Sequence, residues 1–286
     1  MRSWKIVLSA VVLVILFALF LHTENNSVSV TSIVVENKRV PAALDGFKIM
    51  HISDLHSKRF GSNQQKLTKM IRTENPDMVA FTGDLVDRDN YDEEAGIALL
   101  MQALTVAPVY YVTGNHEWWA GRFAELEPKL VNAGITVLRD ENATIRVKGT
   151  ALHIAGVDDI AKFSAHNDRD EALRVNLGRA LEGLPDDDFN ILLAHRPEHV
   201  SAYGSYPVDL VLSGHTHGGQ IRLPFIGGLI APDQGFFPKY AAGAYDFKDM
   251  TLIINRGLGN SVVPQRIFNR PELILITLRK PAVDKR

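Results

Sequence analysis

The sequence of 286 residues contains no cysteine. Disulfide scaffolds, thiolate zinc sites, iron–sulfur clusters and cysteine nucleophiles are therefore excluded, and any metal ion must be held by oxygen and imidazole nitrogen atoms. The sequence also lacks an excess of one charge, because 31 basic and 33 acidic residues leave a formal net charge of −2. Proteins that bind nucleic acid through bulk electrostatics usually carry a clear basic excess, so no nucleic-acid partner is expected.

The first 26 residues differ in composition from the rest of the chain. After Arg2 and Lys5, the segment 6–21 is apolar apart from Ser9, and as a helix it would span ~25 Å. Residues 19–22 include no small residue of the kind that precedes a signal-peptide cleavage site. We expect residues 1–26 to be an uncleaved membrane anchor, in preference to a removed signal sequence or a buried core helix. Residues 24–27 are interpreted as a short polar linker and residues 27–286 as one domain.

Within that domain, short apolar runs alternate with helical patterns. Apolar runs that predict strands cover residues 28–35, 47–53, 78–82, 109–113, 152–157, 190–194, 209–213, 251–255 and 273–278. Helical patterns cover residues 63–74, 93–104, 122–132 and 170–181. Alternation of strands and helices indicates βαβ units, and the strand-rich second half indicates a further sheet. We therefore predict an α/β fold of two packed sheets with helices outside.

Five of the predicted strands are followed directly by residues that can bind metal. In chain order these are Asp54-Leu55-His56, Gly83-Asp84, Gly114-Asn115-His116-Glu117, His195, and Gly214-His215-Thr216-His217. Strand carboxyl ends are where α/β sheets place their sites, so these side chains are expected in one cleft. Two buried carboxylates and several imidazoles are costly to bury together unless cations balance them. A shared carboxylate between two divalent ions roughly 3.5–4 Å apart would meet that need.

These five motifs, in this order, resemble those of the calcineurin-like metallophosphoesterase superfamily. The resemblance covers roughly residues 45–278. The Gly214–Gln220 string, the segment 255–259 and the N-terminal apolar run are more specifically similar to bacterial membrane-anchored phosphodiesterases of the YaeI and YkuE type. The fold that the resemblance implies is a four-layer αββα sandwich, with two mixed sheets flanked by helices.

The resemblance also implies a role for each motif residue. Asp54, His56 and His217 would bind one metal ion, Asn115, His195 and His215 the other, and Asp84 would bridge the two. His116 would be the catalytic acid that protonates the leaving oxygen after a metal-bound hydroxide attacks phosphorus. Oxygen and nitrogen ligands without sulfur suit Mn, Fe or Zn. Glu117 is interpreted instead as a helix-start carboxylate.

The expected function is hydrolysis of a phosphoester by a membrane-associated phosphodiesterase. Its substrate class by resemblance is a lipid-linked pyrophosphate such as UDP-2,3-diacylglucosamine of the lipid A pathway. Alternatives are a phosphomonoesterase, a nuclease, and a non-catalytic metal-stabilised membrane scaffold. Basic residues before the apolar run favour an inner-membrane protein with its catalytic domain on the exported side, which conflicts with a cytosolic lipid precursor.

Three further interpretations concern residues beside the motifs. The apolar stretch 221–237 is predicted to form a loop or short hairpin that faces lipid, with packing onto the second sheet as the alternative. Arg256 and Arg266 are interpreted as surface charges rather than phosphate ligands. Trp118 and Trp119 either border the substrate or pack in the core.

Overall fold

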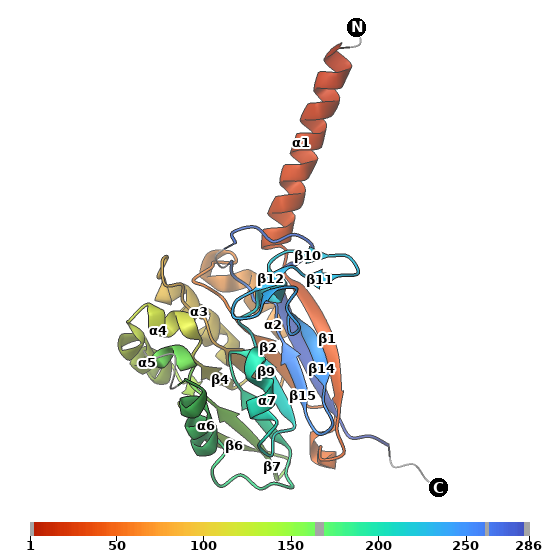
Figure 1. The fold of residues 1–286 in the computed structure, drawn as a ribbon. Helices are drawn as coiled ribbons and strands as arrows, with labels where there is room; N and C mark the ends of the chain where they lie inside the picture. Colours follow the sequence, from red (N-terminus) through yellow and green to blue (C-terminus); the bar gives the residue numbers. More distant parts are fainter. Residues whose placement is uncertain (1–2, 164–168, 261–262, 283–286) are drawn as a thin grey trace.

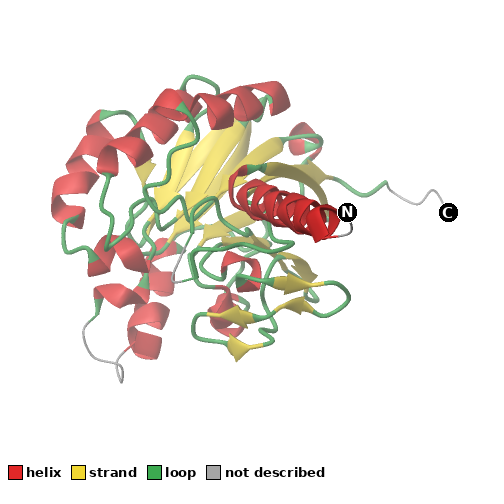
Figure 2. Ribbon diagram, turned by 90° about the horizontal axis from the view of Figure 1, so that it is seen from above, coloured by secondary structure: helices red, strands yellow, loops and turns green. Residues whose placement is uncertain are grey.

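The computed structural model describes residues 3–163, 169–260 and 263–282. It contains two packed six-stranded sheets with helices on their outer faces (Figures 1 and 2). These are the four layers of the predicted αββα sandwich. A single long helix leaves one end of this sandwich (Figure 1).

The first sheet has the strand order β1-β16-β2-β3-β4-β5. Its strands are β1 (Ser29–Glu36), β16 (Glu272–Arg279), β2 (Lys48–Ile52), β3 (Met78–Thr82), β4 (Val109–Val112) and β5 (Thr136–Val137). Neighbours pair in parallel except β16 and β2, which are antiparallel. The first strand, β1, thus pairs with β16, the last strand of the described residues.

The second sheet has the order β14-β15-β9-β8-β7-β6. Its strands are β14 (Gly243–Asp246), β15 (Thr251–Ile254), β9 (Leu210–Ser213), β8 (Asn190–Leu193), β7 (Thr150–Gly156) and β6 (Glu141–Val147). The four central strands are parallel, and the two edge strands are antiparallel to their neighbours. Parallel central strands direct their carboxyl ends to the same edge.

Apolar side chains fill three layers of core. One cluster lies between the sheets and includes Ile49, Val112, Ile191 and Ile274, all fully buried. The other clusters lie beneath helices, because both faces of each central strand are covered. Those helices are α2 (Gln65–Glu74), α3 (Glu93–Leu104) and α5 (Phe123–Asn132) on the first sheet, with α6 (Arg169–Ala180) and α7 (Val200–Tyr203) on the second.

Helix α1 (Ser3–Asn26) projects from the sandwich and is long and apolar enough to cross a membrane (Figure 1). Its residues 4–19 are exposed, as expected for a segment whose partner would be lipid rather than protein. The predicted linker over residues 24–27 was wrong, because the helix continues through Asn26 and Glu24 is buried. Hydrogen bonds of Glu24 and Asn25 to residues 264–270 hold this last turn helical against the sandwich.

Most predicted elements occur within one to three residues of their expected bounds. Sequence patterning missed β6 and β14, whose alternation is weak because they lie at sheet edges. It also missed the short helix α4 (Asn115–Trp119). Residues 221–237 form two short hairpins, β10–β11 (Arg222–Leu223, Gly227–Gly228) and β12–β13 (Ile230–Ala231, Gly235–Phe236). The prediction of a short hairpin is confirmed, and whether the stretch faces lipid or packs onto the second sheet is not decided by the pairing of its strands.

Candidate metal centre

The candidate ligands all follow strand carboxyl ends, but from both sheets rather than one. Asp54 and His56 follow β2, Asp84 follows β3 and Asn115 follows β4, whereas His195 follows β8 and the pair His215 and His217 follows β9. All seven side chains are buried in the described structure. The structure therefore brings together every residue that the sequence placed in the site.

One group consists of Asp54, His56, Asp84 and His217, whose donor atoms all lie within 4.8 Å of one another. His56 Nε2 is 3.5 Å from Asp84 Oδ2 and 3.0 Å from His217 Nε2. His217 Nε2 is also 3.4 Å from Asp54 Oδ1. Two carboxylates and two imidazoles thus converge on one point.

A second group shares Asp84 and adds His195 and His215. His195 Nε2 lies 3.3 Å from Asp84 Oδ2, 3.2 Å from Asn115 Oδ1 and 3.2 Å from His215 Nδ1. The Asp84 carboxylate is the common member of both groups. This position is the one that a carboxylate bridging two divalent cations requires.

The chemistry of the donor set fits divalent metal ions. His195 Nδ1 lies 2.7 Å from the carbonyl oxygen of Thr82, and His56 Nδ1 lies 3.2 Å from Asp87 Oδ2. In the neutral form of each ring, a proton on Nδ1 would serve that acceptor and leave the Nε2 lone pair for a cation in the cluster. The oxygen and nitrogen donors without sulfur match Mn, Fe or Zn.

The cluster also requires positive charge. Burial disfavours charge on Asp84 and on His195, yet their mutual attraction dominates: the pKa of Asp84 is held well below its ordinary value and the pKa of His195 is raised to about 10. Burial raises the pKa of Asp54, and the negative charge of the neighbouring Asp84 carboxylate raises it further. His195 and Asp54 thus both hold protons more tightly than usual. Bound cations could supply the positive charge in place of these protons and so stabilise the site.

The backbone holds the ligands in unusual conformations. Asp54, His56, Asp84, His215 and His217 all have positive φ, between 47° and 68°. Such left-handed residues cost free energy and persist where the surrounding structure forces them, often at functional sites. Glycines make the required space: a Cβ on Gly214 would overlap Ser53 Oγ and the Asp54 carboxylate, and one on Gly83 would lie 2.8 Å from His195 Nδ1.

His116 stands at the first turn of α4, beside both groups. Its backbone nitrogen donates to Asp84 Oδ1 at 2.8 Å, and its ring stacks edge-on against His56 with centroids 4.4 Å apart. Its Nδ1 accepts a hydrogen bond from the backbone nitrogen of Arg88 at 3.1 Å, so the proton of the neutral ring is on Nε2. Burial lowers the pKa of His116.

The neighbours of His116 have distinct roles. Glu117 accepts hydrogen bonds from the backbone nitrogens of residues 84, 85, 86 and 114, which confirms its reading as a helix-start carboxylate. Trp118 packs on Phe123 in the core. Trp119 is about half exposed, and its ring centroid lies 5.3 Å from that of His116. Only Trp119 therefore borders the site.

Sequence reasoning missed several charged residues around the centre. Asp87 and Asp233 accept from candidate ligands His56 and His215, at 3.2 and 3.1 Å respectively. Arg196 is buried and donates to Asp159 at 2.7 Å and to Asp233. Its place directly after His195 was the available signal, since a residue next to a ligand reaches the same cleft.

The reading of Arg266 as a surface charge was wrong. Its side chain is 1% exposed, and its Nη2 lies 3.3 Å from His217 Nδ1 while donating to the backbone oxygens of Arg256 and Gly259. Burial lowers its pKa to about 10. The buried guanidinium is stabilised by backbone carbonyl groups that tertiary folding brings to it. Amino-acid composition alone does not reveal such partners. Arg256 is partly exposed and pairs with Glu272 at 2.5 Å.

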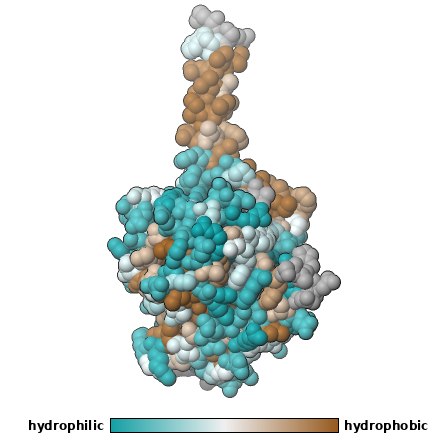
Figure 3. Space-filling model, turned by 90° about the vertical axis from the view of Figure 1, so that its left-hand side faces the viewer, coloured by the Kyte–Doolittle hydropathy of each residue, from teal (hydrophilic) through white to brown (hydrophobic). Residues whose placement is uncertain are grey.

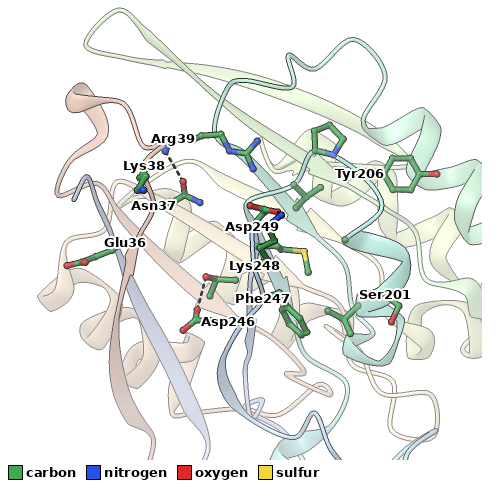
Figure 4. Close-up of a pocket in the computed structure, with 16 residues that line it drawn as sticks. Glu36, Asn37, Lys38, Arg39, Ser201, Tyr206, Asp246, Phe247, Lys248 and Asp249 are labelled. Atoms are coloured by element: carbon green, nitrogen blue, oxygen red, sulfur yellow. Dashed lines mark hydrogen bonds and ion pairs between the residues drawn. The ribbon is translucent and has the colours of Figure 1, made fainter. Parts of the chain in front are cut away.

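A separate hollow of about 950 Å³ lies away from the metal donors (Figure 4). It is lined by the end of β1, the turn between β14 and β15, and residues near α7. Its charged side chains are of both signs, including Lys38, Arg39, Asp246 and Asp249. It contains none of the candidate ligands, so the candidate chemistry belongs to the strand ends and not to this hollow.

Comparison with known proteins agrees with this geometry. The model of the calcineurin-like phosphoesterase family matches residues 47–219. The metallophosphoesterase YkuE of Bacillus subtilis is 32% identical over 264 residues, covering 90% of this chain and 88% of that protein. The metallophosphoesterase YkoQ of the same bacterium is 29% identical over 277 residues, covering 94% and 98%. A bovine transmembrane protein with a metallophosphoesterase domain is 31% identical over 265 residues, covering 88% of this chain and 57% of that protein. This chain belongs to the calcineurin-like phosphoesterase family and is a metal-dependent hydrolase of phosphoric esters.

Proposed function

We propose that this chain is a membrane-associated phosphodiesterase with a dinuclear metal centre. Asp54, His56 and His217 would hold one divalent cation, Asn115, His195 and His215 the other, and Asp84 both. Such ions, whether Mn, Fe or Zn, supply a nucleophile at neutral pH and neutralise phosphoryl oxygens. Burial of all seven side chains and the central position of Asp84 support this assignment.

The observation that carries the proposal is the placement of His116. Arg88 donates its backbone N–H to His116 Nδ1, which fixes the tautomer with the proton on Nε2. A neutral imidazole with this proton is suited to protonate the leaving alkoxide of a phosphoester. The contact between His116 N and Asp84 Oδ1 holds the ring beside the centre. His116 is therefore assigned as the general acid.

The charges around the centre favour a diester over a monoester. A monoester is largely dianionic at neutral pH and gains from further free cations, whereas a diester carries one negative charge. The two arginines nearest the ligands are already occupied: Arg196 by Asp159, Asp233 and Glu198, and Arg266 by backbone oxygens. The carboxylates around Arg196 already balance its charge, and the buried Arg266 is held by carbonyl oxygens, so neither favours recognition of a second phosphate charge.

The position of the site supports a lipid-linked substrate. Helix α1 and the candidate centre lie at the same end of the sandwich (Figure 1). A membrane-bound phosphoester would thus meet the centre without leaving the bilayer surface. Inner-membrane localisation with the domain on the exported side is the arrangement favoured by Arg2 and Lys5. A UDP-linked diacylglucosamine would require the cytosolic side, so orientation decides whether that substrate is accessible.

The test uses His116→Ala in the full chain loaded with Mn. We expect two bound metals per chain to be retained, and hydrolysis of an alkyl phosphodiester to fall by roughly 10²–10⁴-fold, the contribution typical of an acid. Hydrolysis of a nitrophenyl diester should fall much less, because nitrophenolate leaves without protonation. Equal losses on both diesters would refute the acid role.

The unsubstituted protein separates the alternatives for the substrate. Its rates are compared on an alkyl phosphodiester, a phosphomonoester, single-stranded DNA and a nucleoside-diphosphate lipid in vesicles. We expect the diester or pyrophosphate lipid to be preferred over the monoester and DNA. Preference for the monoester would overturn the diesterase proposal, and a metal-loaded protein inactive on all four would favour the scaffold.

A further inference from the structure

We propose that the sandwich makes a second contact with the bilayer, separate from helix α1, through exposed apolar side chains around the base of that helix. The base of α1 is defined as residues 22–26. The contact surface, called the apolar patch, consists of Leu223, Phe225, Ile226, Phe236, Phe237 and Phe268. Its occupant is the lipid headgroup and acyl-chain boundary of the membrane that α1 enters. The inference does not depend on which phosphoester is hydrolysed.

The patch consists of large side chains that contact little protein. Phe225 is fully exposed, Phe236 is 71% exposed, and Ile226, Phe237 and Phe268 are each more than half exposed. Hydrophobic residues gather beside the base of the helix in Figure 3. Soluble surfaces rarely expose aromatic residues in such a group unless they bind something. Removing each of these side chains from water would favour binding to the membrane interface.

The base of α1 is fixed to the sandwich, so the patch has a defined position relative to the membrane. Glu24 is buried and accepts hydrogen bonds from Arg270 Nε at 2.8 Å and from the backbone nitrogen of Asn269 at 3.1 Å. Asn25 Oδ1 accepts from the backbone nitrogen of Arg266 at 2.7 Å, and Lys58 Nζ donates to the Asn25 carbonyl at 2.6 Å. A helix held by this many contacts is not a flexible tether.

The patch is continuous with the apolar surface of the helix. Phe20, in the last apolar turn of α1, contacts Phe268 with ring centroids 5.4 Å apart. The hairpins β10–β11 and β12–β13 lie beside the same end of the helix (Figure 1). Once residues 4–21 are in the bilayer, Phe268 and the hairpins are at the interface, where aromatic side chains are favourable. Continuity with the spanning helix therefore selects lipid as the occupant.

The patch and the candidate metal centre share structural elements. The turn of hairpin β12–β13 carries Asp233, whose Oδ2 lies 3.1 Å from His215 Nε2. In the segment that carries Phe268, Asn269 Nδ2 donates to the His217 carbonyl at 2.7 Å. Seating the patch in the interface would consequently place the centre against the bilayer surface.

The absence of native cysteine permits a direct test. Phe225→Cys and Phe236→Cys are each labelled with an environment-sensitive nitrobenzoxadiazole dye in the full chain, reconstituted into phosphatidylethanolamine–phosphatidylglycerol vesicles. Val175→Cys is the matched control, because it is about half exposed on α6 and away from the helix base. The measurement is the emission maximum and its quenching by lipids with spin labels on the acyl chain.

We expect a blue shift and loss of emission by lipid quenching at positions 225 and 236, and neither at position 175. Quenching by aqueous iodide should be strong only at position 175. Lipid quenching at one or neither hairpin position would overturn the proposal. Shielding from iodide without lipid quenching, dependent on protein density, would indicate a second copy as the occupant and would also overturn it.

Discussion

Among single residues, Asp84 is the one shared by both groups of candidate ligands. Asp84→Asn removes the negative charge that two cations would share while keeping the size of the side chain. We expect metal affinity to fall by more than the roughly 10–100-fold that loss of an outer hydrogen-bond partner costs. Turnover should fall with it. Elemental analysis of the purified protein and hydrolysis rates measure both effects.

The matched control for this substitution is Asp249→Asn, an exposed aspartate in the turn between β14 and β15. It should retain both metals and unchanged rates. Two bound metals and normal turnover in Asp84→Asn would contradict the dinuclear assignment.

The local sequence identifies the candidate metal ligands better than it identifies the residues that hydrogen-bond to those ligands. The motif residues were identifiable because carboxylate, amide and imidazole groups recur directly after strands. Asp87 and Asp233 are acidic residues in loops, and nothing in their local sequence shows that each faces a histidine ring. Arg266 was misread for the same reason, since its acceptors are carbonyl groups brought close by tertiary folding.

Among the elements, the base of α1 links the membrane segment to the centre through residues 264–270. Glu24→Ala removes a buried carboxylate and leaves the backbone nitrogen of Asn269 without its acceptor. We expect the free energy of unfolding to fall by about 1.5–3 kcal/mol, the range for hydrogen bonds to charged groups. Asn269 also supports the backbone at His217, so metal retention should decrease as well. Thermal unfolding in detergent and metal content measure the two effects.

Thr23→Ala is the control in the same helical turn, because no described hydrogen bond involves the Thr23 side chain. It should change neither quantity. A Glu24→Ala protein as stable and as metal-loaded as the Thr23→Ala protein would show that the helix base does not support the sandwich.

For the whole molecule, orientation in the membrane is the open property that a single experiment decides. Arg2 and Lys5 precede the apolar run, and the next basic residues after it are Lys38 and Arg39. The bias of positive residues toward the cytoplasm favours an exported sandwich. Protease added to spheroplasts should therefore digest the sandwich, as followed by immunoblotting.

Digestion in detergent-permeabilised cells serves as the positive control for protease sensitivity. A sandwich protected in intact spheroplasts but digested after permeabilisation would place the centre in the cytosol. That result would reverse the orientation and make a cytosolic nucleotide-linked lipid accessible.

The fold followed from the sequence wherever local pattern and burial agree. The strands β3 and β4 are short, continuously apolar and central, so patterning found them almost to the residue. Edge strands β6 and β14 are half exposed, and their mixed composition carries little periodic signal. The hydrophobic pattern predicted only two packed sheets with helices outside. The resemblance to a known superfamily added the αββα order of the four layers.

The sequence by itself determined the donor chemistry of the centre: no sulfur, two aspartates, an asparagine and several histidines, each directly after a strand. Local order sufficed because a strand end is defined within a few residues. Only the tertiary structure decided that β2–β4 and β8–β9 meet across two sheets, that left-handed backbone turns aim five ligands inward, and that the helix base and Phe268 share a surface. Such contacts join residues up to 248 positions apart. They depend on packing across the whole fold, which no local pattern records.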